Sequence, residues 1–116
     1  MNALPTVLAK RTEPGGGEIE ILVAENNPWF AGHFPGHPIL PGVAQIAWAV
    51  HYAAELYAGT PPPPGLEQVK FKRPILPGTR LTLRLTRAAD GTRLHYEYRD
   101  AEQSYSSGVL DFRKRA

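Results

Sequence analysis

The sequence has 116 residues, a formal net charge of +2 and no cysteine, which excludes disulfides and metal sites built on thiolates. A chain of this length is expected to form one domain, residues 1–116. The small charge, with no basic stripe interleaved with aromatic side chains, argues against nucleic-acid binding.

The first part of the chain predicts a β-hairpin. Residues 1–11 are too short and too weakly apolar for a signal peptide, and no later run suits a membrane span, so we expect a cytoplasmic location. Residues 4–11 are expected to form a short edge strand, and residues 18–24 alternate apolar and acidic side chains as a half-buried strand does. The glycine-rich segment 13–17 between them predicts a turn.

The next part predicts a helix that starts beside a histidine loop. Residues 41–57 are apolar on nearly every side, which predicts a helix surrounded by other structure. Pro41 suits the first helical turn, and Gly42 after it has no side chain to shield the free backbone N–H groups there. His33 and His37 lie in the proline-rich loop just before. The polar residues within the helix are Gln45, His51 and Glu55.

The second half predicts four more strands. Four consecutive prolines within residues 59–65 predict a stiff polyproline connector at the surface. Apolar and polar side chains alternate after it, and Asp90-Gly91 is a strong hairpin signal. The expected strands are residues 66–73, 79–88, 92–99 and 103–112.

These elements predict an α+β fold in which an antiparallel sheet is wrapped around one long central helix. A single layer of this kind leaves part of the helix and a sheet edge uncovered, so we expect a dimer. The four histidines have no metal-binding pattern, so no metal is expected.

Two motifs resemble a known enzyme family. Residues 33–43 read HFPGHPILPGV and residues 69–78 read VKFKRPILPG. Both resemble the hot-dog-fold 3-hydroxyacyl-[acyl-carrier-protein] dehydratases of the FabZ and FabA type, and the short chain is most similar to the small ApeI-like branch. The resemblance covers about residues 18–112. It implies dehydration of a 3-hydroxyacyl thioester to the trans-2-enoyl thioester, in fatty-acid-like or aryl-polyene biosynthesis.

The resemblance also implies residue roles. His33 would take the proton from C2, and the Gly42 N–H would polarise the thioester carbonyl. No cofactor is implied, since the substrate is carried on the phosphopantetheine arm of acyl carrier protein. The residues expected to line the substrate tunnel or shape its loop are Phe34, Pro35, Gly36, His37, Pro41, Val43, Ile46 and His51.

One position departs from the family pattern. The family's acid, which handles the departing hydroxyl, lies fourteen residues after the motif histidine, and this chain has Ala47 there. A methyl group cannot donate a proton, and acid–base catalysis typically contributes about 10²–10⁴ in rate. The chain alone is therefore expected to be a poor dehydratase, and Ala47→Asp is expected to raise its rate.

Three explanations for Ala47 remain open. The alanine is an engineered change, or it is natural in a subunit that completes its site with an acid-bearing partner, or another residue acts in its place. His51 lies one helical turn after Ala47 on the same face and could hold the catalytic water. Glu55 is one turn further and is expected to lie too far away.

The sequence also contains a basic cluster and leaves two other functions open. Lys70, Lys72 and Arg73 are either a solvated strand face or a contact for acyl carrier protein and the phosphate of its arm. The alternative to a homodimeric enzyme is a non-catalytic or half-site subunit that pairs with a related dehydratase. A hot-dog thioesterase is the third interpretation, although no carboxylate stands near the helix start.

Overall fold

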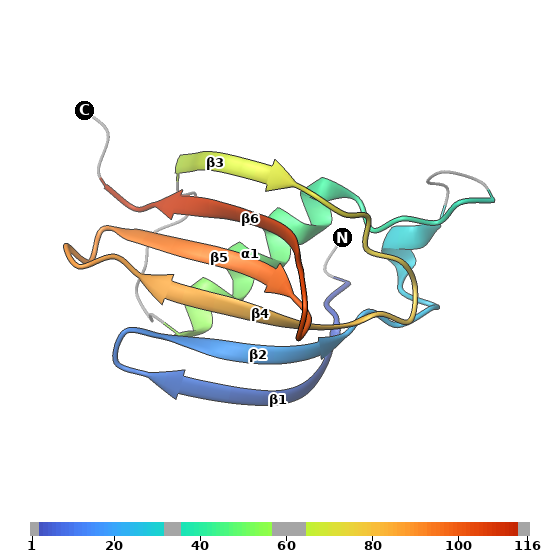
Figure 1. Ribbon diagram of the computed structural model, residues 1–116, viewed down its shortest axis with the longest axis horizontal. Helices are drawn as coiled ribbons and strands as arrows, with labels where there is room; N and C mark the ends of the chain where they lie inside the picture. Colours follow the sequence, from blue (N-terminus) through green and yellow to red (C-terminus); the bar gives the residue numbers. More distant parts are fainter. Residues whose placement is uncertain (1–2, 32–35, 57–64, 114–116) are drawn as a thin grey trace.

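The computed structural model describes residues 3–31, 36–56 and 65–113, which form one antiparallel sheet crossed by one α-helix (Figure 1). The helix α1 spans Gly42–Leu56, and a short 3-10 helix, η1, spans Pro28–Phe30. The six strands are β1 (Thr6–Glu13), β2 (Gly16–Leu22), β3 (Gly65–Phe71), β4 (Arg80–Arg87), β5 (Arg93–Arg99) and β6 (Ser104–Asp111). The predicted α+β class is confirmed, and none of the described helices is long and apolar enough to cross a membrane.

The strands lie in the order β1-β2-β4-β5-β6-β3, and every neighbouring pair is antiparallel. The hairpin predicted at Asp90-Gly91 is confirmed, since β4 pairs with β5, and β4, β5 and β6 are consecutive in both sequence and space. β3 precedes β4 in the chain but pairs with β6 at the far edge of the sheet. The helix therefore lies in the crossover between β2 and β3, against one face of the sheet (Figure 1).

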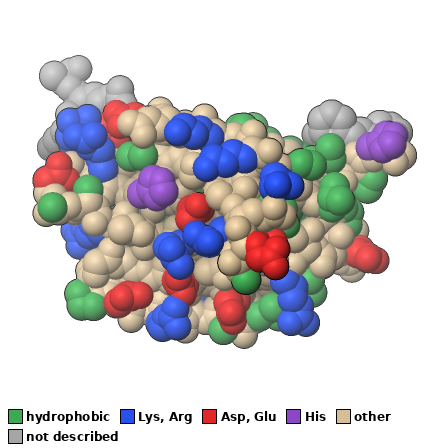
Figure 2. Space-filling view, viewed as in Figure 1, with side chains coloured by type: hydrophobic (Ala, Val, Ile, Leu, Met, Phe, Trp, Pro, Cys, Tyr) green, Lys and Arg blue, Asp and Glu red, His purple; other side chains and the backbone are tan. Residues whose placement is uncertain are grey.

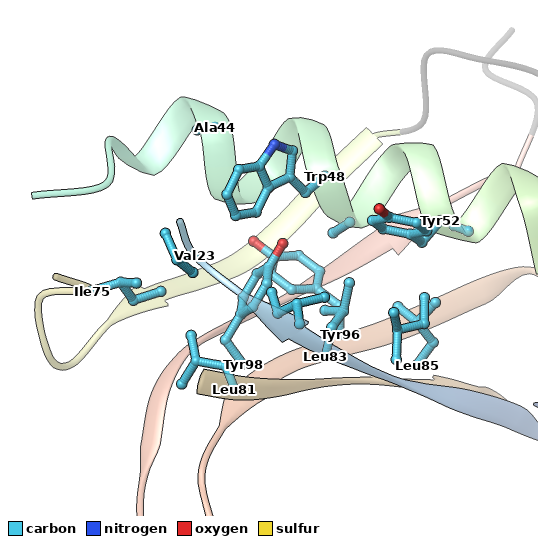
Figure 3. Close-up of a cluster of buried hydrophobic side chains, with 14 of the residues drawn as sticks. Val23, Ala44, Trp48, Tyr52, Ile75, Leu81, Leu83, Leu85, Tyr96 and Tyr98 are labelled. Atoms are coloured by element: carbon cyan, nitrogen blue, oxygen red, sulfur yellow. The ribbon is translucent and has the colours of Figure 1, made fainter. Parts of the chain in front are cut away.

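Alternating apolar residues of the strands point to that helix. Leu83 and Tyr98 pair across β4 and β5, as do Leu85 and Tyr96, and all four are buried. Figure 3 shows these side chains below Trp48 and Tyr52, which project from α1 into the same cluster. The strands are thus half-buried, as their alternating sequences predict, and the core lies between the helix and one face of the sheet.

The sheet covers only one face of α1. The buried helical residues are Ala44, Gln45, Trp48, Ala49, Tyr52 and Ala53. On the opposite face Val43 is 64% exposed, and Ala47 and Ala54 are exposed as well. A single chain thus leaves one side of the helix uncovered, as expected for one sheet layer, since a sheet can contact only one side of a cylinder.

The first hairpin is tighter than predicted. β1 begins at Thr6 rather than at residue 4, and the expected turn at 13–17 is shorter because Gly16 and Gly17 belong to β2. A Cβ on Gly16 would clash with the Leu85 carbonyl oxygen of β4. Glycine at this position therefore allows the backbones to approach closely, and the glycine run extends the strand instead of forming a loop.

The other face of the sheet is charged. Basic and acidic side chains interleave over it, and lysine and arginine side chains lie along the edge formed by β3 (Figure 2). Glu18 of β2 pairs with Arg11 of β1 and with Arg84 of β4. Such exposed pairs contribute little stability, so this face acts mainly as the solvated side of the sheet.

Candidate active site

The start of α1 lies at the position that the sequence predicts. The helix begins at Gly42, directly after Pro41, and the Pro41 carbonyl accepts hydrogen bonds from the N–H groups of Ala44 and Gln45 at 3.1 and 3.3 Å. The first N–H groups of a helix have no intrahelical partner and form its positive end. This end is suited to stabilise a developing negative charge on an oxygen.

An aromatic ring lies over this helix start. A Cβ on Gly42 would lie 2.7 Å from Cζ of Phe71, so only glycine leaves room for the ring in this position. Phe71 ends β3 and is 54% exposed. This contact could not be predicted from the sequence, because the two residues are far apart in the chain and meet only when β3 pairs with β6.

A groove of about 410 Å³ opens between the helix start and the end of β3. The ring of Phe71 forms part of its wall, and its lining is mainly apolar. Its basic residues are Lys72 and Arg73, which follow Phe71. The groove therefore joins the candidate oxygen-binding helix start to two of the three residues of the predicted basic cluster, and it could take an extended chain with a negatively charged end.

The basic residues of the groove are held in place by their backbone. The Tyr105 carbonyl accepts hydrogen bonds from the N–H groups of Lys72 and Arg73 at 2.9 and 3.1 Å. The N–H groups of Glu102 and Gln103 hold the pKa of Asp100 below its usual range, and the charge of Arg73 acts in the same direction. Within the described part of the chain no ion pair involves Lys70 or Lys72.

A buried glutamine fixes the first turn of α1 to the sheet. Gln45 is 3% exposed, and its Nε2 donates to the Leu40 carbonyl at 3.2 Å. Its Oε1 accepts from the Ser106 hydroxyl at 2.5 Å, and its carbonyl accepts from the Tyr98 hydroxyl at 2.7 Å. Burial raises the pKa of Tyr98 well above its ordinary value, so this hydroxyl stays a donor. The lone polar residue of the first turns is thus an anchor, which its isolation in an apolar stretch could have indicated.

Ala47 lies on the uncovered face of α1, with Val43 one turn before it. His51 follows one turn after it, as predicted, but its Nε2 lies 2.9 Å from Oε2 of Glu55. Lys10 of β1 donates to Oε1 of Glu55 at 2.7 Å. The polar cluster of His51, Glu55 and Lys10 thus borders the apolar stripe that contains Ala47. The sequence could not indicate Lys10, since its partner is 45 residues away.

The remaining predicted site residues lie in the loop before the helix and in its first turns. His33, Phe34 and Pro35 lie outside the described residues. Gly36 and His37 are exposed in the turn that leads to the helix, and the φ of 82° at Gly36 suits glycine. Pro41 and Ile46 are half-buried at the helix start. Among the described residues, no group of three or more potential metal-binding side chains occurs.

The chain is similar to known dehydratases in sequence. The family model described as "ApeI-like: ApeI dehydratase" matches residues 9–109. A 3-hydroxyacyl-[acyl-carrier-protein] dehydratase FabZ from Syntrophotalea carbinolica is 41% identical over 85 residues, covering 63% of this chain and 56% of that protein. The chain spans about half the length of the curated relatives it matches.

Two solved structures are similar along nearly the whole chain. A chain of the dehydratase heterocomplex ApeI:P from Xenorhabdus doucetiae has a TM-score of 0.84 and 34% identity, covering 92% of this chain and 96% of that one. An uncharacterized protein from Erwinia carotovora subsp. atroseptica has a TM-score of 0.79 and 36% identity, covering 92% and 94%. These matches confirm the resemblance drawn from the two sequence motifs and the hot-dog fold that it implied.

Proposed function

The chain belongs to the ApeI-like dehydratase family, and we propose that it converts 3-hydroxyacyl thioesters on acyl carrier protein to trans-2-enoyl thioesters. The observation that carries this proposal is the family match over residues 9–109, which contain both the loop motif and the helix start. The reaction would serve fatty-acid-like or aryl-polyene biosynthesis in the cytoplasm. No cofactor takes part in the proposed reaction, which is an elimination of water.

The proposed chemistry divides between two groups of this chain. The imidazole of His33, when neutral, removes a proton from C2, since its ordinary pKa lies near the working pH of an enzyme. The Gly42 N–H at the positive end of α1 donates to the thioester oxygen as negative charge develops on it. A single positioned donor of this kind contributes about 10²–10³ in rate.

The substrate arm is proposed to enter through the groove beside Phe71. Its apolar wall suits the pantetheine chain, and Lys72 at its rim suits the phosphate or the acidic carrier protein. Lys70, exposed near the end of β3, would add to the attraction. Arg73 contributes less in this proposal, because its charge also acts on Asp100.

Dimerisation is part of the proposal. The exposed face of α1, with Val43 and Ala47, and the outer edge of β3 are surfaces that a single chain leaves uncovered. In the proposed dimer, His33 of one chain faces position 47 of the other across the interface. A monomer in sedimentation equilibrium at micromolar concentration would contradict this arrangement.

The test is product analysis by mass spectrometry with a 3-hydroxyacyl thioester. We expect enoyl product from the Ala47→Asp variant, at a rate about a hundredfold or more above the unchanged chain, the low end for a positioned acid. His33→Ala should abolish this gain. Free acid as the product would instead indicate a thioesterase. An Ala47→Asp variant that folds and binds the thioester but gives no enoyl product would refute the proposal.

A half-site subunit is the second candidate, and one observation favours it. The similar chain from Xenorhabdus doucetiae comes from a dehydratase heterocomplex. This chain has Ala47 where the family has its acid, so in a site formed by two subunits it could supply the histidine but not the acid. Such a subunit would supply His33 to an acid-bearing relative. Co-expression with that relative tests the idea. If the mixed complex is active, and His33→Ala in this chain alone abolishes that activity, the half-site role is supported.

A further inference from the structure

We propose that His51, oriented by Glu55 and Lys10, supplies the proton to the departing hydroxyl in place of the acid missing at position 47. The inference rests on the proposed dehydratase function and assigns its missing step. It concerns the chain with Ala47, in which this route supports a low but measurable rate.

The three residues form a connected cluster. The Nε2 atom of His51 lies 2.9 Å from Oε2 of Glu55, and the ammonium of Lys10 lies 2.7 Å from Oε1 of the same carboxylate. The hydrogen bond from Lys10 is the main cause that holds the pKa of Glu55 below its usual range, so this carboxylate stays ionised. Lys10 also lies 5.6 Å from the ring centroid of Tyr52, which helps to fix its position.

These contacts fix the orientation of the imidazole. The ring of His51 meets that of Tyr52 edge to face, with centroids 4.9 Å apart, while Glu55 binds Nε2. An ionised carboxylate on one ring nitrogen determines which nitrogen carries the proton. Within the described residues Nδ1 forms no hydrogen bond, so it is available to a substrate or a water. A histidine paired with a carboxylate in this way is a common arrangement for proton transfer.

Helix geometry places His51 beside the vacant position. Residues four apart lie on the same face, one turn of about 5.4 Å along the axis. Each Cα–Cβ bond tilts toward the N-terminus of the helix, so the Cβ of His51 lies on the side of the turn that contains Ala47, while Glu55 binds Nε2 from the other side. The alanine methyl leaves that surface open.

The neighbouring helix surface indicates that this site becomes covered. Apart from the charged Glu55 and Lys10, the exposed residues on this side of the helix are small or apolar: Val43 is 64% exposed, and Ala47 and Ala54 are exposed. In the proposed dimer this stripe lies against the partner subunit. The imidazole, half-exposed in a single chain, would then border a space from which bulk water is largely excluded, where proton transfer to a bound substrate is effective.

The proposed step balances as follows. His33 takes the C2 proton, the C2 electron pair forms the C2–C3 double bond, and the C3–O bond breaks. The leaving hydroxyl takes one proton from the imidazolium of His51 and departs as water. His51 is then neutral and His33 protonated, and exchange with solvent restores both. No oxidant, reductant or metal is consumed.

The first experiment replaces the imidazole. His51→Gln should lower dehydration of a 3-hydroxyacyl pantetheine thioester at least about tenfold, a loss smaller than the 10²–10⁴ typical of acid–base groups because the ring stands one turn from the family's acid. His95→Gln, on the exposed side of β5, is the matched control and should leave the rate unchanged. An unchanged rate in His51→Gln overturns the proposal.

The second experiment tests the positioning residues. Glu55→Gln keeps a hydrogen-bonding side chain but removes the charge, and should shift the pH profile of kcat/KM. The charged and titratable groups facing His51 are Glu55 and Tyr52 on α1 and Lys10 on β1. A rate loss without any shift in the profile would indicate a structural role only, and would count against the assigned orientation.

The third experiment separates this inference from the function on which it rests. In the Ala47→Asp background the new carboxylic acid should make His51 dispensable, so His51→Gln there should change the rate less than threefold. If Ala47→Asp is active but the chain with Ala47 shows no His51-dependent rate, the inference fails and the dehydratase function stands. If neither chain gives enoyl product, the proposed function fails first.

Discussion

The anchor at Gln45 gives a quantitative test of how the helix start is held. Gln45→Leu keeps the side-chain volume but leaves the Leu40 carbonyl and the Ser106 hydroxyl without their partner. Each unsatisfied buried group costs about 1–3 kcal/mol, and burying the leucine side chain offsets about 2 kcal/mol. We therefore expect a net loss of about 2 kcal/mol in the free energy of unfolding.

A double-mutant cycle isolates the buried hydrogen bond. Ser106→Ala leaves Oε1 of Gln45 unpaired and should also cost about 2 kcal/mol. The variant Gln45→Leu with Ser106→Ala removes both partners together, so its loss should fall short of the sum by about 2 kcal/mol.

The assay is urea unfolding at fixed protein concentration, since a dimer's stability depends on concentration. Trp48 projects from α1 into the core, so its fluorescence reports the transition (Figure 3). If the two losses add within 0.5 kcal/mol, or if Gln45→Leu is as stable as the native chain, the buried contact does not fix the helix start.

Three further outcomes are expected. Gly42→Ala should lower kcat/KM about tenfold or more, because the methyl displaces the ring of Phe71 and a shift near 1 Å can cost about a hundredfold; Phe71→Ala in the same chain should recover part of the loss, and no recovery would contradict the packing. Lys72→Glu should weaken carrier-protein substrates more than pantetheine thioesters, and equal effects would indicate a folding defect. Arg113 holds the pKa of Asp111 well below its usual range, a stabilisation present above the ordinary carboxyl pKa and lost as pH falls; Arg113→Ala should therefore move acid unfolding, followed by circular dichroism, to higher pH, and an unmoved midpoint would contradict the pairing.

The local elements and the family could be predicted from the amino-acid sequence. Leu81, Leu83 and Leu85 alternate with polar residues, and all three are buried on one face of β4. This succeeds because side chains of a strand point alternately to its two faces, so burial follows a period of two. The loop motif at residues 33–43 and the alanine at position 47 were likewise visible without coordinates.

The tertiary structure alone decided which distant residues meet. β3 pairs with β6 and not with β4, its successor in the chain, and this brings Phe71 over Gly42. Nothing local in either segment encodes the contact, since it depends on the edge of the sheet at which β3 pairs. In the same way Lys10 reaches Glu55 only because β1 lies beside the end of α1. Hydrogen bonds and charge pairs of this kind are satisfied across the fold, so their partners follow from three-dimensional packing and not from spacing along the chain.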